Sequence, residues 1–255
     1  MFRLAINAGH GINTPGKRCM KSIDNNETRE WILNNRICNK IEQKLSSYLG
    51  IEILRTDDRN GTVDRSVSSR AKIANSFGAD LYLSIHHNAG INGGSGGGIM
   101  AFTYLSVDNT TLQWQKDLYL AAINRTGLKG NRSSPLSQQN LGECRQTSMP
   151  AVLMECGFMD STTDTPIILT EDFAEKISCA FTEVIVNKAK LKYTASPTTA
   201  TIYEIYRVRS SWEDTASQIG AYRILNNAIK VAQKNKLNVY NKSGRCIWEY
   251  RKSQS

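Results

Sequence analysis

The sequence predicts an α/β domain with a twisted, mostly parallel or mixed sheet flanked by helices, followed by a small C-terminal α+β domain with a βαββ-like pattern. Three observations support this. Over residues 1–190, short apolar segments alternate with segments whose apolar residues recur at helical spacing. The short segments are apolar on both faces, as in parallel strands covered by helices on both sides. A polar segment with one proline, 191–201, then precedes the last part of the chain.

The large domain is expected to begin with a strand at Phe2–Asn7 that ends at Gly9. A polar, turn-rich loop over 11–29 follows. Apolar residues at helical spacing then predict a helix from about Glu30 to Leu49, closed by Gly50. The same alternation predicts strands at 51–55, 80–85, 99–104 and 151–154, and helices at 68–77, 109–123 and 172–189.

The small domain is expected to begin with a strand at 203–209. One helix over 211–235, or two with a break at Gly220, comes next. Two strands joined by a turn end the domain, at 237–240 and 247–250. A module of about 55 residues is near the lower limit for stability alone, so self-association through it is a hypothesis.

The composition excludes several classes of protein. Hydrophobic residues make up 40% of the chain, which excludes global disorder. No apolar run approaches the roughly 18–20 residues of a membrane span, and the N-terminus lacks a signal-peptide pattern. The six cysteines are scattered without a CxxC pair, so we expect free, mostly buried thiols made in a reducing cytosol.

The net charge of +9 is unevenly spread along the chain. Residues 201–255 hold 10 Lys and Arg against 4 Asp and Glu, so +6 of the excess lies in the last fifth of the sequence. A local basic excess indicates an anionic partner such as nucleic acid, a membrane surface or a cell-wall polymer.

The chain has only three histidines, His10, His86 and His87. His10 and His86 each follow a predicted strand, so both can lie at the same edge of the sheet, where sites gather in such folds. Taken singly, His10 is better explained as an ordinary loop histidine and His86 as a hydrogen-bonded core histidine. Together they could bind one metal ion if a third ligand converges on them.

Two carboxylates near the start of the first helix are candidates for that ligand. Helical steps from Glu30 reach the apolar face of the helix, whereas seven residues from Glu27 lead to Asn34. A carboxylate aimed at the core is costly unless it is paired or metal-bound, which favours Glu30 over Glu27. Glu155 ends another apolar strand, where an acid is unexpected on packing grounds. A base near a metal-bound water would explain it, and so would an exposed carboxylate at the end of the strand.

Four motifs in this order resemble those of zinc-dependent N-acetylmuramoyl-L-alanine amidases of the amidase-3 type. They are AGHG at 8–11, an acidic residue that opens the first helix, ADLYLSIHHNA at 79–89 and SMPAVLMECGF at 148–158. The segment RAKIAN at 70–75 also fits the short helix that precedes the second histidine motif in that family. The resemblance covers roughly residues 1–190.

The resemblance implies that His10, Glu30 and His86 bind Zn²⁺ and that Glu155 is the catalytic acid/base. His87 stands where many relatives have Ala, and we expect no metal role for it. The implied reaction is hydrolysis of the amide between N-acetylmuramic acid and L-alanine in peptidoglycan by zinc-activated water. A zinc peptidase that cuts the stem peptide and a wall-binding protein with a decayed site are the alternatives.

The segments YRVRSSW at 206–212 and SQIGAY at 217–222 resemble a C-terminal module of clostridial phage endolysins and, more weakly, sporulation-related glycan-binding repeats. This implies a catalytic domain at 1–190, a linker at 191–201 and a wall-binding domain at 202–255. Basic residues with four aromatics suit an anionic, sugar-bearing polymer; the aromatics are Trp212, Tyr222, Trp248 and Tyr250. Single-stranded nucleic acid or a structural cap are rival interpretations.

We therefore expect an endolysin that lyses its host. Its partner would be the peptidoglycan of a Gram-positive, clostridial cell wall, with no nucleic-acid partner. It would be made in the host cytoplasm and reach the wall after membrane permeabilisation.

Overall fold

The computed structural model describes residues 1–194, 206–222, 225–241 and 244–250. The chain divides into two compact units, Met1–Thr194 and Ala195–Ser255, and each is described by itself. None of the helices described is long and apolar enough to cross a membrane. All six cysteines are free thiols, and four of them are buried, as the sequence predicts.

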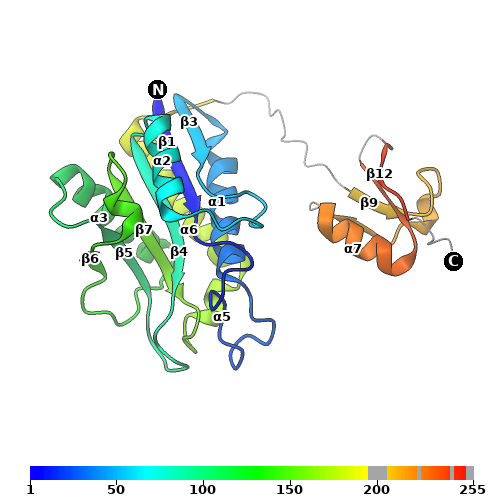
Figure 1. The fold of residues 1–255 in the computed structure, drawn as a ribbon, viewed down its shortest axis with the longest axis horizontal. Coiled ribbons are helices and arrows are strands. Elements are labelled where there is room, and N and C mark those ends of the chain that lie inside the picture. The colour runs from blue at the N-terminus through cyan, green and yellow to red at the C-terminus, as the bar shows by residue number, and fades with distance from the viewer. Residues whose placement is uncertain (195–205, 223–224, 242–243, 251–255) are drawn as a thin grey trace. The chain divides into compact units, whose positions relative to one another are not determined.

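The large unit is built on a six-stranded mixed sheet in the order β3-β1-β4-β7-β5-β6 (Figure 1). Strands β3, β1, β4 and β7 are parallel, β5 is antiparallel to β7, and β6 is parallel to β5. The bounds are β1 Phe2–Ala8, β3 Ile51–Arg55, β4 Leu81–Asn88, β5 Ile99–Thr103, β6 Leu136–Gln138 and β7 Ala151–Phe158. The predicted fold class of this domain is confirmed.

Helices cover both faces of the sheet. On one face, α1, α3 and α6 pack with β1, β4 and β7 around the main core, through residues such as Ile37, Leu118 and Phe181. On the other face, Ala74 of α2 and Cys144 of α4 pack against Tyr82. The helix bounds are α1 Glu30–Leu45, α2 Val67–Phe77, α3 Asn109–Thr126, α4 Gly142–Arg145, α5 Thr165–Ile168 and α6 Glu171–Ala189.

The predicted end of the first helix at Leu49 is wrong. Helix α1 ends at Leu45, because β2 (Tyr48–Leu49) pairs with β8 (Lys192–Tyr193) in a two-stranded sheet. Residues 192–193 of the expected linker are therefore part of the large unit, and the rest of that segment from 195 onwards lies outside the described residues.

The small unit has a four-stranded sheet in the order β10-β9-β11-β12 with α7 packed on it. Its core contains Val208, Ala228, Ala232 and Val239. The element bounds are β9 Tyr206–Arg209, η1 Thr215–Ser217, β10 Gly220–Tyr222, α7 Leu225–Asn235, β11 Asn238–Tyr240 and β12 Cys246–Trp248.

The prediction of helix over 211–235 is wrong in its first half. Asp214 caps the short turn η1 by accepting a hydrogen bond from the Ser217 amide, and residues 220–222 pair with β9 as strand β10. Among the described residues, the helix spans Leu225–Asn235. The apolar residues of this segment recur at helical spacing, but pairing of its backbone with β9 makes residues 220–222 a strand.

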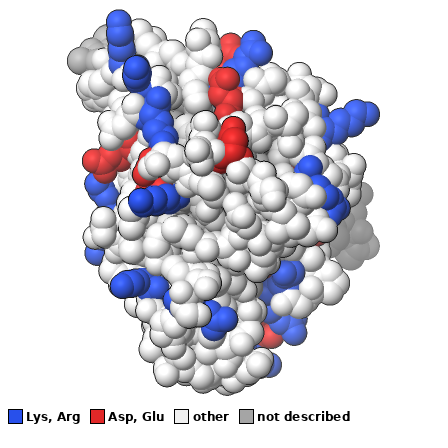
Figure 2. Space-filling model, turned by 90° about the vertical axis from the view of Figure 1, so that its left-hand side faces the viewer, with Lys and Arg blue, Asp and Glu red and all other residues white. Residues whose placement is uncertain are grey.

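The basic residues on the face drawn in Figure 2 are spread over the surface, and several lie beside acidic ones. The sum of charges along the chain therefore does not by itself locate a binding surface.

Candidate metal centre

Three of the predicted site residues meet at the carboxyl edge of the sheet. Among the residues that the structure describes, His10, Glu30 and His86 form the one group of three potential metal ligands, with ligand atoms within 4.8 Å of one another. Glu30 Oε2 lies 3.4 Å from His10 Nε2, and Glu30 Oε1 lies 3.1 Å from His86 Nδ1. Three residues separated by up to 76 positions in sequence thus lie close together.

The turn after β1 brings His10 against His86. His10 adopts the left-handed backbone conformation, with φ of 64°, which is uncommon for a residue with a side chain and is found mostly where surrounding contacts enforce it. Gly9 before it has no side chain, and a Cβ there would lie 2.1 Å from Cε1 of His86. The imidazole of His86 therefore occupies the space that a side chain at position 9 would need.

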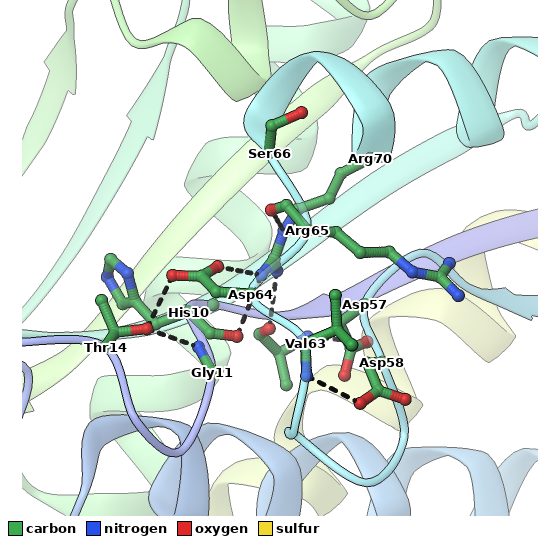
Figure 3. A network of polar contacts seen from close by, with 12 residues as sticks. His10, Gly11, Thr14, Asp57, Asp58, Val63, Asp64, Arg65, Ser66 and Arg70 are labelled. Atoms are coloured by element: carbon green, nitrogen blue, oxygen red, sulfur yellow. Dashed lines mark hydrogen bonds and ion pairs between the residues drawn. The ribbon is translucent and has the colours of Figure 1, made fainter.

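Arg70 of α2 stabilises this turn through hydrogen bonds to its backbone. Its guanidinium is buried and donates hydrogen bonds to the carbonyl oxygens of Ala8 at 2.8 Å and His10 at 2.9 Å. It also pairs with Asp64 at 3.0 Å and, through Nε, donates to the Arg65 carbonyl at 2.8 Å. Figure 3 shows this guanidinium between the His10 turn and the 64–66 segment. These contacts offset the strain of the His10 backbone.

Asp64 also accepts a hydrogen bond from a second residue of the loop that carries His10. Thr14 Oγ1 donates to Asp64 at 2.6 Å and accepts from the Gly11 amide at 2.9 Å (Figure 3). The loop that carries His10 is therefore tied at both ends to the segment before α2.

Glu30 is the first residue of α1, and its carboxylate is fully buried. Its Oε1 accepts hydrogen bonds from the His87 amide at 3.2 Å and from Asn34 Nδ2 at 3.3 Å. Lys17 Nζ lies 3.8 Å from Oε2. Glu27, the other candidate, lies in the preceding loop and pairs with Arg18 at 3.0 Å, so the structure brings Glu30 and not Glu27 to the histidines.

The charges of this group depend on one another. Burial would lower the pKa of His86, but Glu143 and Glu30 outweigh burial and raise it to about 10. Burial would raise the pKa of Glu30, but the hydrogen bond and charge of His86, with His10, lower it to about 2. Burial lowers the pKa of His10 to about 4, against the attraction of Glu30. Without a metal, His86 is therefore the residue of this group that is protonated at neutral pH.

His87 points away from the ligands. Its Nδ1 lies 2.8 Å from Asn34 Oδ1, and burial lowers its pKa to about 3. Successive side chains of a strand alternate between faces, so His86 shares the α2 side of the sheet with Tyr82 and Ser84. The sequence did not indicate which face carries the site.

Glu155 lies on the neighbouring strand in register with His86. Paired residues of parallel strands share a face, so Glu155 is on the His86 side of the sheet. Its Oε2 is buried with no hydrogen-bond partner among the described residues. Burial raises its pKa to about 7, against the attraction of His86. A carboxyl group that exchanges a proton near neutral pH suits acid/base work.

Sequence reasoning missed Glu143, a further buried carboxylate at the site. It belongs to the four-residue helix α4, and its Oε2 lies 3.6 Å from His86 Nε2. Burial would raise the pKa of Glu143, but the interaction with His86, aided by Ser84, lowers it to about 2. So short a helix has no periodicity to detect, and no motif marks this glutamate.

A cavity of about 360 Å³ opens beside the ligands. His10, His86 and Glu143 line it together with Arg65 and the apolar side chains of Leu141 and Leu153. A substrate in this cavity would therefore reach both histidines.

The group fits a zinc ion by its donors and spacing. Two imidazoles and a carboxylate are a ligand set of catalytic zinc sites, which leave a further position for water or substrate. A tetrahedral centre with bonds of about 2.0–2.1 Å sets its ligands roughly 3.3 Å apart. The 3.4 Å between His10 Nε2 and Glu30 Oε2 is close to this spacing, and one ligand atom from each of the three residues lies within 4.8 Å of the others. Glu30 Oε2 is buried and has no hydrogen-bond partner among the described residues, as expected of an atom reserved for a metal.

A His–Glu–His group at the sheet edge with a second, protonatable carboxyl group beside it is the arrangement of a metal-dependent hydrolase. Residues 4–187 match the model of the Amidase_3 family, described as N-acetylmuramoyl-L-alanine amidase. The chain belongs to this family.

Known proteins similar to this chain agree with that membership. The sporulation-specific N-acetylmuramoyl-L-alanine amidase of Bacillus subtilis (strain 168) is 27% identical over 237 residues, which is 91% of this chain and 80% of that protein. The endolysin of Bacillus phage SPP1 is 29% identical over 187 residues, or 73% of this chain and 66% of that protein.

The fold is also found among solved structures. The N-acetylmuramoyl-L-alanine amidase from Clostridium difficile 630 superimposes with a TM-score of 0.66 at 24% identity, over 74% of this chain and 97% of that one. The catalytic domain of CwlV from Bacillus (Paenibacillus) polymyxa var. colistinus gives 0.64 at 23%, over 75% and 100%.

The three histidines offer a direct test of the electrostatics. In protein stripped of metal, we expect His86 to be protonated at pH 7.5 and His10 and His87 to be neutral. The raised pKa of His86 stabilises the fold fully below pH about 6.5, and this contribution is lost as the pH rises through about 10. The lowered pKa values of His10 and His87 act oppositely, so stability falls as the pH drops below about 6.5.

The measurement is an NMR titration of the imidazole C–H signals, with each histidine assigned by a single His→Gln substitution. A His86 signal that titrates at or below pH 6.5 would contradict the account.

Proposed function

We propose that the protein is a zinc-dependent amidase that hydrolyses the bond between N-acetylmuramic acid and L-alanine. The observation that carries the proposal is the buried Glu30 carboxylate, with one oxygen near each histidine and Oε2 lacking a hydrogen bond among the described residues. Family membership and the names of the relatives support the choice of substrate.

The residues divide the chemistry between them. His10 Nε2, Glu30 and His86 Nδ1 would hold the zinc ion, which when bound would polarise the amide carbonyl and lower the pKa of water. Glu155 takes a proton from the attacking water on its carboxylate and passes it to the leaving amine of L-alanine. Burial, which raises the pKa of Glu155 in the metal-free protein, favours its holding the proton between the two transfers. Arg70 holds His10 in place through the backbone.

The biological role we propose is that of an endolysin which lyses a Gram-positive host. The similarity to the endolysin of Bacillus phage SPP1 supports it. The similarity to a sporulation-specific amidase favours a second candidate, a bacterial enzyme that remodels its own wall. The match to the sporulation-specific amidase covers 91% of this chain. The large unit holds only 194 of the 255 residues, so this match extends into the small unit.

We propose that the small unit binds the cell wall. Arg207 and Arg209 lie over the ring of Trp212, with guanidinium carbons 5.8 and 4.9 Å from its centroid. Tyr222 and Trp248 pack partly against the core of the unit instead, so Trp212 is the aromatic best placed beside basic groups. Arg209 is buried and donates hydrogen bonds to Gln218 and to the Trp212 carbonyl, so it fixes the ring. The half-buried Arg207 beside the ring is the cation that would meet an anionic polymer that carries sugars.

Replacing Glu155 by Gln separates chemistry from metal binding. We expect Glu155→Gln to keep one zinc ion per chain and to lose roughly 10²–10⁴-fold in turnover, because the amide cannot accept the proton. Zinc content by mass spectrometry and release of L-alanine N-termini from purified walls measure the two effects.

Two matched substitutions control the metal measurement. Glu30→Gln should lose the zinc, whereas Glu27→Gln in the preceding loop should keep it. Turnover unchanged in Glu155→Gln would contradict its role, and release of peptides cut within the stem, rather than of free glycan and L-alanine ends, would favour a peptidase.

Wall binding is tested with the full-length Glu155→Gln protein, which does not digest its target. We expect it to sediment with purified Gram-positive walls, and a chain that ends at Thr194 to bind at least roughly tenfold more weakly, since one of two binding units is lost. Equal sedimentation of both chains, or equally tight binding to a single-stranded oligonucleotide, would count against a wall-binding unit.

A further inference from the structure

Glu143 is a buried carboxylate at the site, and it has no role in the proposed reaction. We propose that Glu143 is a positioning residue, which accepts a hydrogen bond from Nε2–H of His86 and so holds the ring in the tautomer whose Nδ1 is free to bind the metal. The inference rests on the proposed zinc function.

The two nitrogens of His86 face two different carboxylates. Nδ1 lies 3.1 Å from Glu30 Oε1, within the group of three ligands. Nε2 lies 3.6 Å from Glu143 Oε2, slightly beyond hydrogen-bond length, and no other described residue offers it a partner. The ring therefore lies between a ligand carboxylate and a carboxylate that is not in the ligand group.

This arrangement selects one tautomer. A neutral imidazole carries its proton on one nitrogen and a lone pair on the other. If Nδ1 binds the metal, the proton must be on Nε2, where Glu143 is the acceptor within reach. Histidines that bind metals commonly donate their second N–H to a carboxylate, which fixes the ring and makes it a better ligand.

The other contacts of Glu143 hold its carboxylate in place. Ser84 donates a hydrogen bond from Oγ to Oε2, and Asn7 Nδ2 lies 3.3 Å from Oε1. Ser84 is two residues before His86 on the same face of β4, and Asn7 accepts a hydrogen bond from Arg70. The carboxylate is therefore anchored by the same strands that carry His10 and His86.

The burial of the Glu143 carboxylate among these neighbours costs free energy and calls for an explanation. Burying a charge without a full counter-ion is costly, and Glu143 has only neutral hydrogen-bond donors besides His86 in the contacts described. A charged acceptor for the Nε2 proton is a function that a leucine of similar size could not supply.

The test compares zinc-binding strength in full-length Glu143→Gln and Glu143→Leu proteins by competition with a chromophoric chelator. We expect zinc affinity to fall by about 10–100-fold in Glu143→Leu and by less in Glu143→Gln, whose amide oxygen can still accept the proton. Glu27→Gln is the matched control for loss of a carboxylate near the site, and it should keep the wild-type affinity. If Glu143→Leu does not fold, Glu143→Gln decides the question.

A second readout follows the tautomer itself. Long-range ¹H–¹⁵N NMR of the zinc-loaded protein should show His86 protonated at Nε2, with the proton signal moving upfield and exchanging faster with water in both variants. Unchanged affinity and an unchanged signal in both variants would overturn the inference.

Two further outcomes would also overturn it. Complete loss of zinc, equal to that of Glu30→Gln, would make Glu143 a ligand. Loss of turnover with unchanged zinc affinity would make it a catalytic acid/base. Failure of the wild-type protein to bind zinc would instead reject the proposed function, so the two failures are distinguishable.

Discussion

The structure of the site depends on the burial of one carboxylate. Glu30 is fully buried at the start of α1, with His10 and His86 beside its two oxygens. A buried charge of this kind is tolerated only when partners compensate it. The surrounding loop, both histidines and Lys17 are arranged around that requirement. A metal ion would supply the compensation that the imidazoles alone give only when His86 is protonated.

The scaffold around Glu30 is rigid where the ligands need it. His10 is held in a strained backbone conformation by the guanidinium of Arg70, and Gly9 leaves room for the ring of His86. His86 and Glu155 are fixed relative to each other by the register of β4 and β7. Ligands that lie on strands and on a braced turn keep their geometry better than ligands on a free loop.

Much of the large unit could be predicted because its patterns are local. Apolar strands and the helical spacing of Leu33, Ile37 and Ile41 identify β1, β4 and α1, and they place Glu30 at the inward side of the helix. Glu30 could be favoured over Glu27 as the metal ligand only because helical steps from Glu30, and not from Glu27, lead to that apolar face.

What could not be predicted depends on tertiary contacts. The face of the sheet that carries His86 is decided by packing against α2, and the strand at 220–222 by its pairing with β9. Glu143 became visible only once α4 was seen packed at His86, 57 residues away in sequence. A carboxylate without a motif carries no signal of its role until the fold shows what it faces.

Zinc-edge X-ray absorption of the full-length protein tests the central claim most directly. A centre built from His10, Glu30 and His86 predicts a first shell of nitrogen and oxygen alone at about 2.0–2.1 Å, with imidazole scattering from two histidines. The chain also has six free cysteines, which are alternative zinc ligands. A sulfur shell at about 2.3 Å, or a shell without imidazole, would contradict the account.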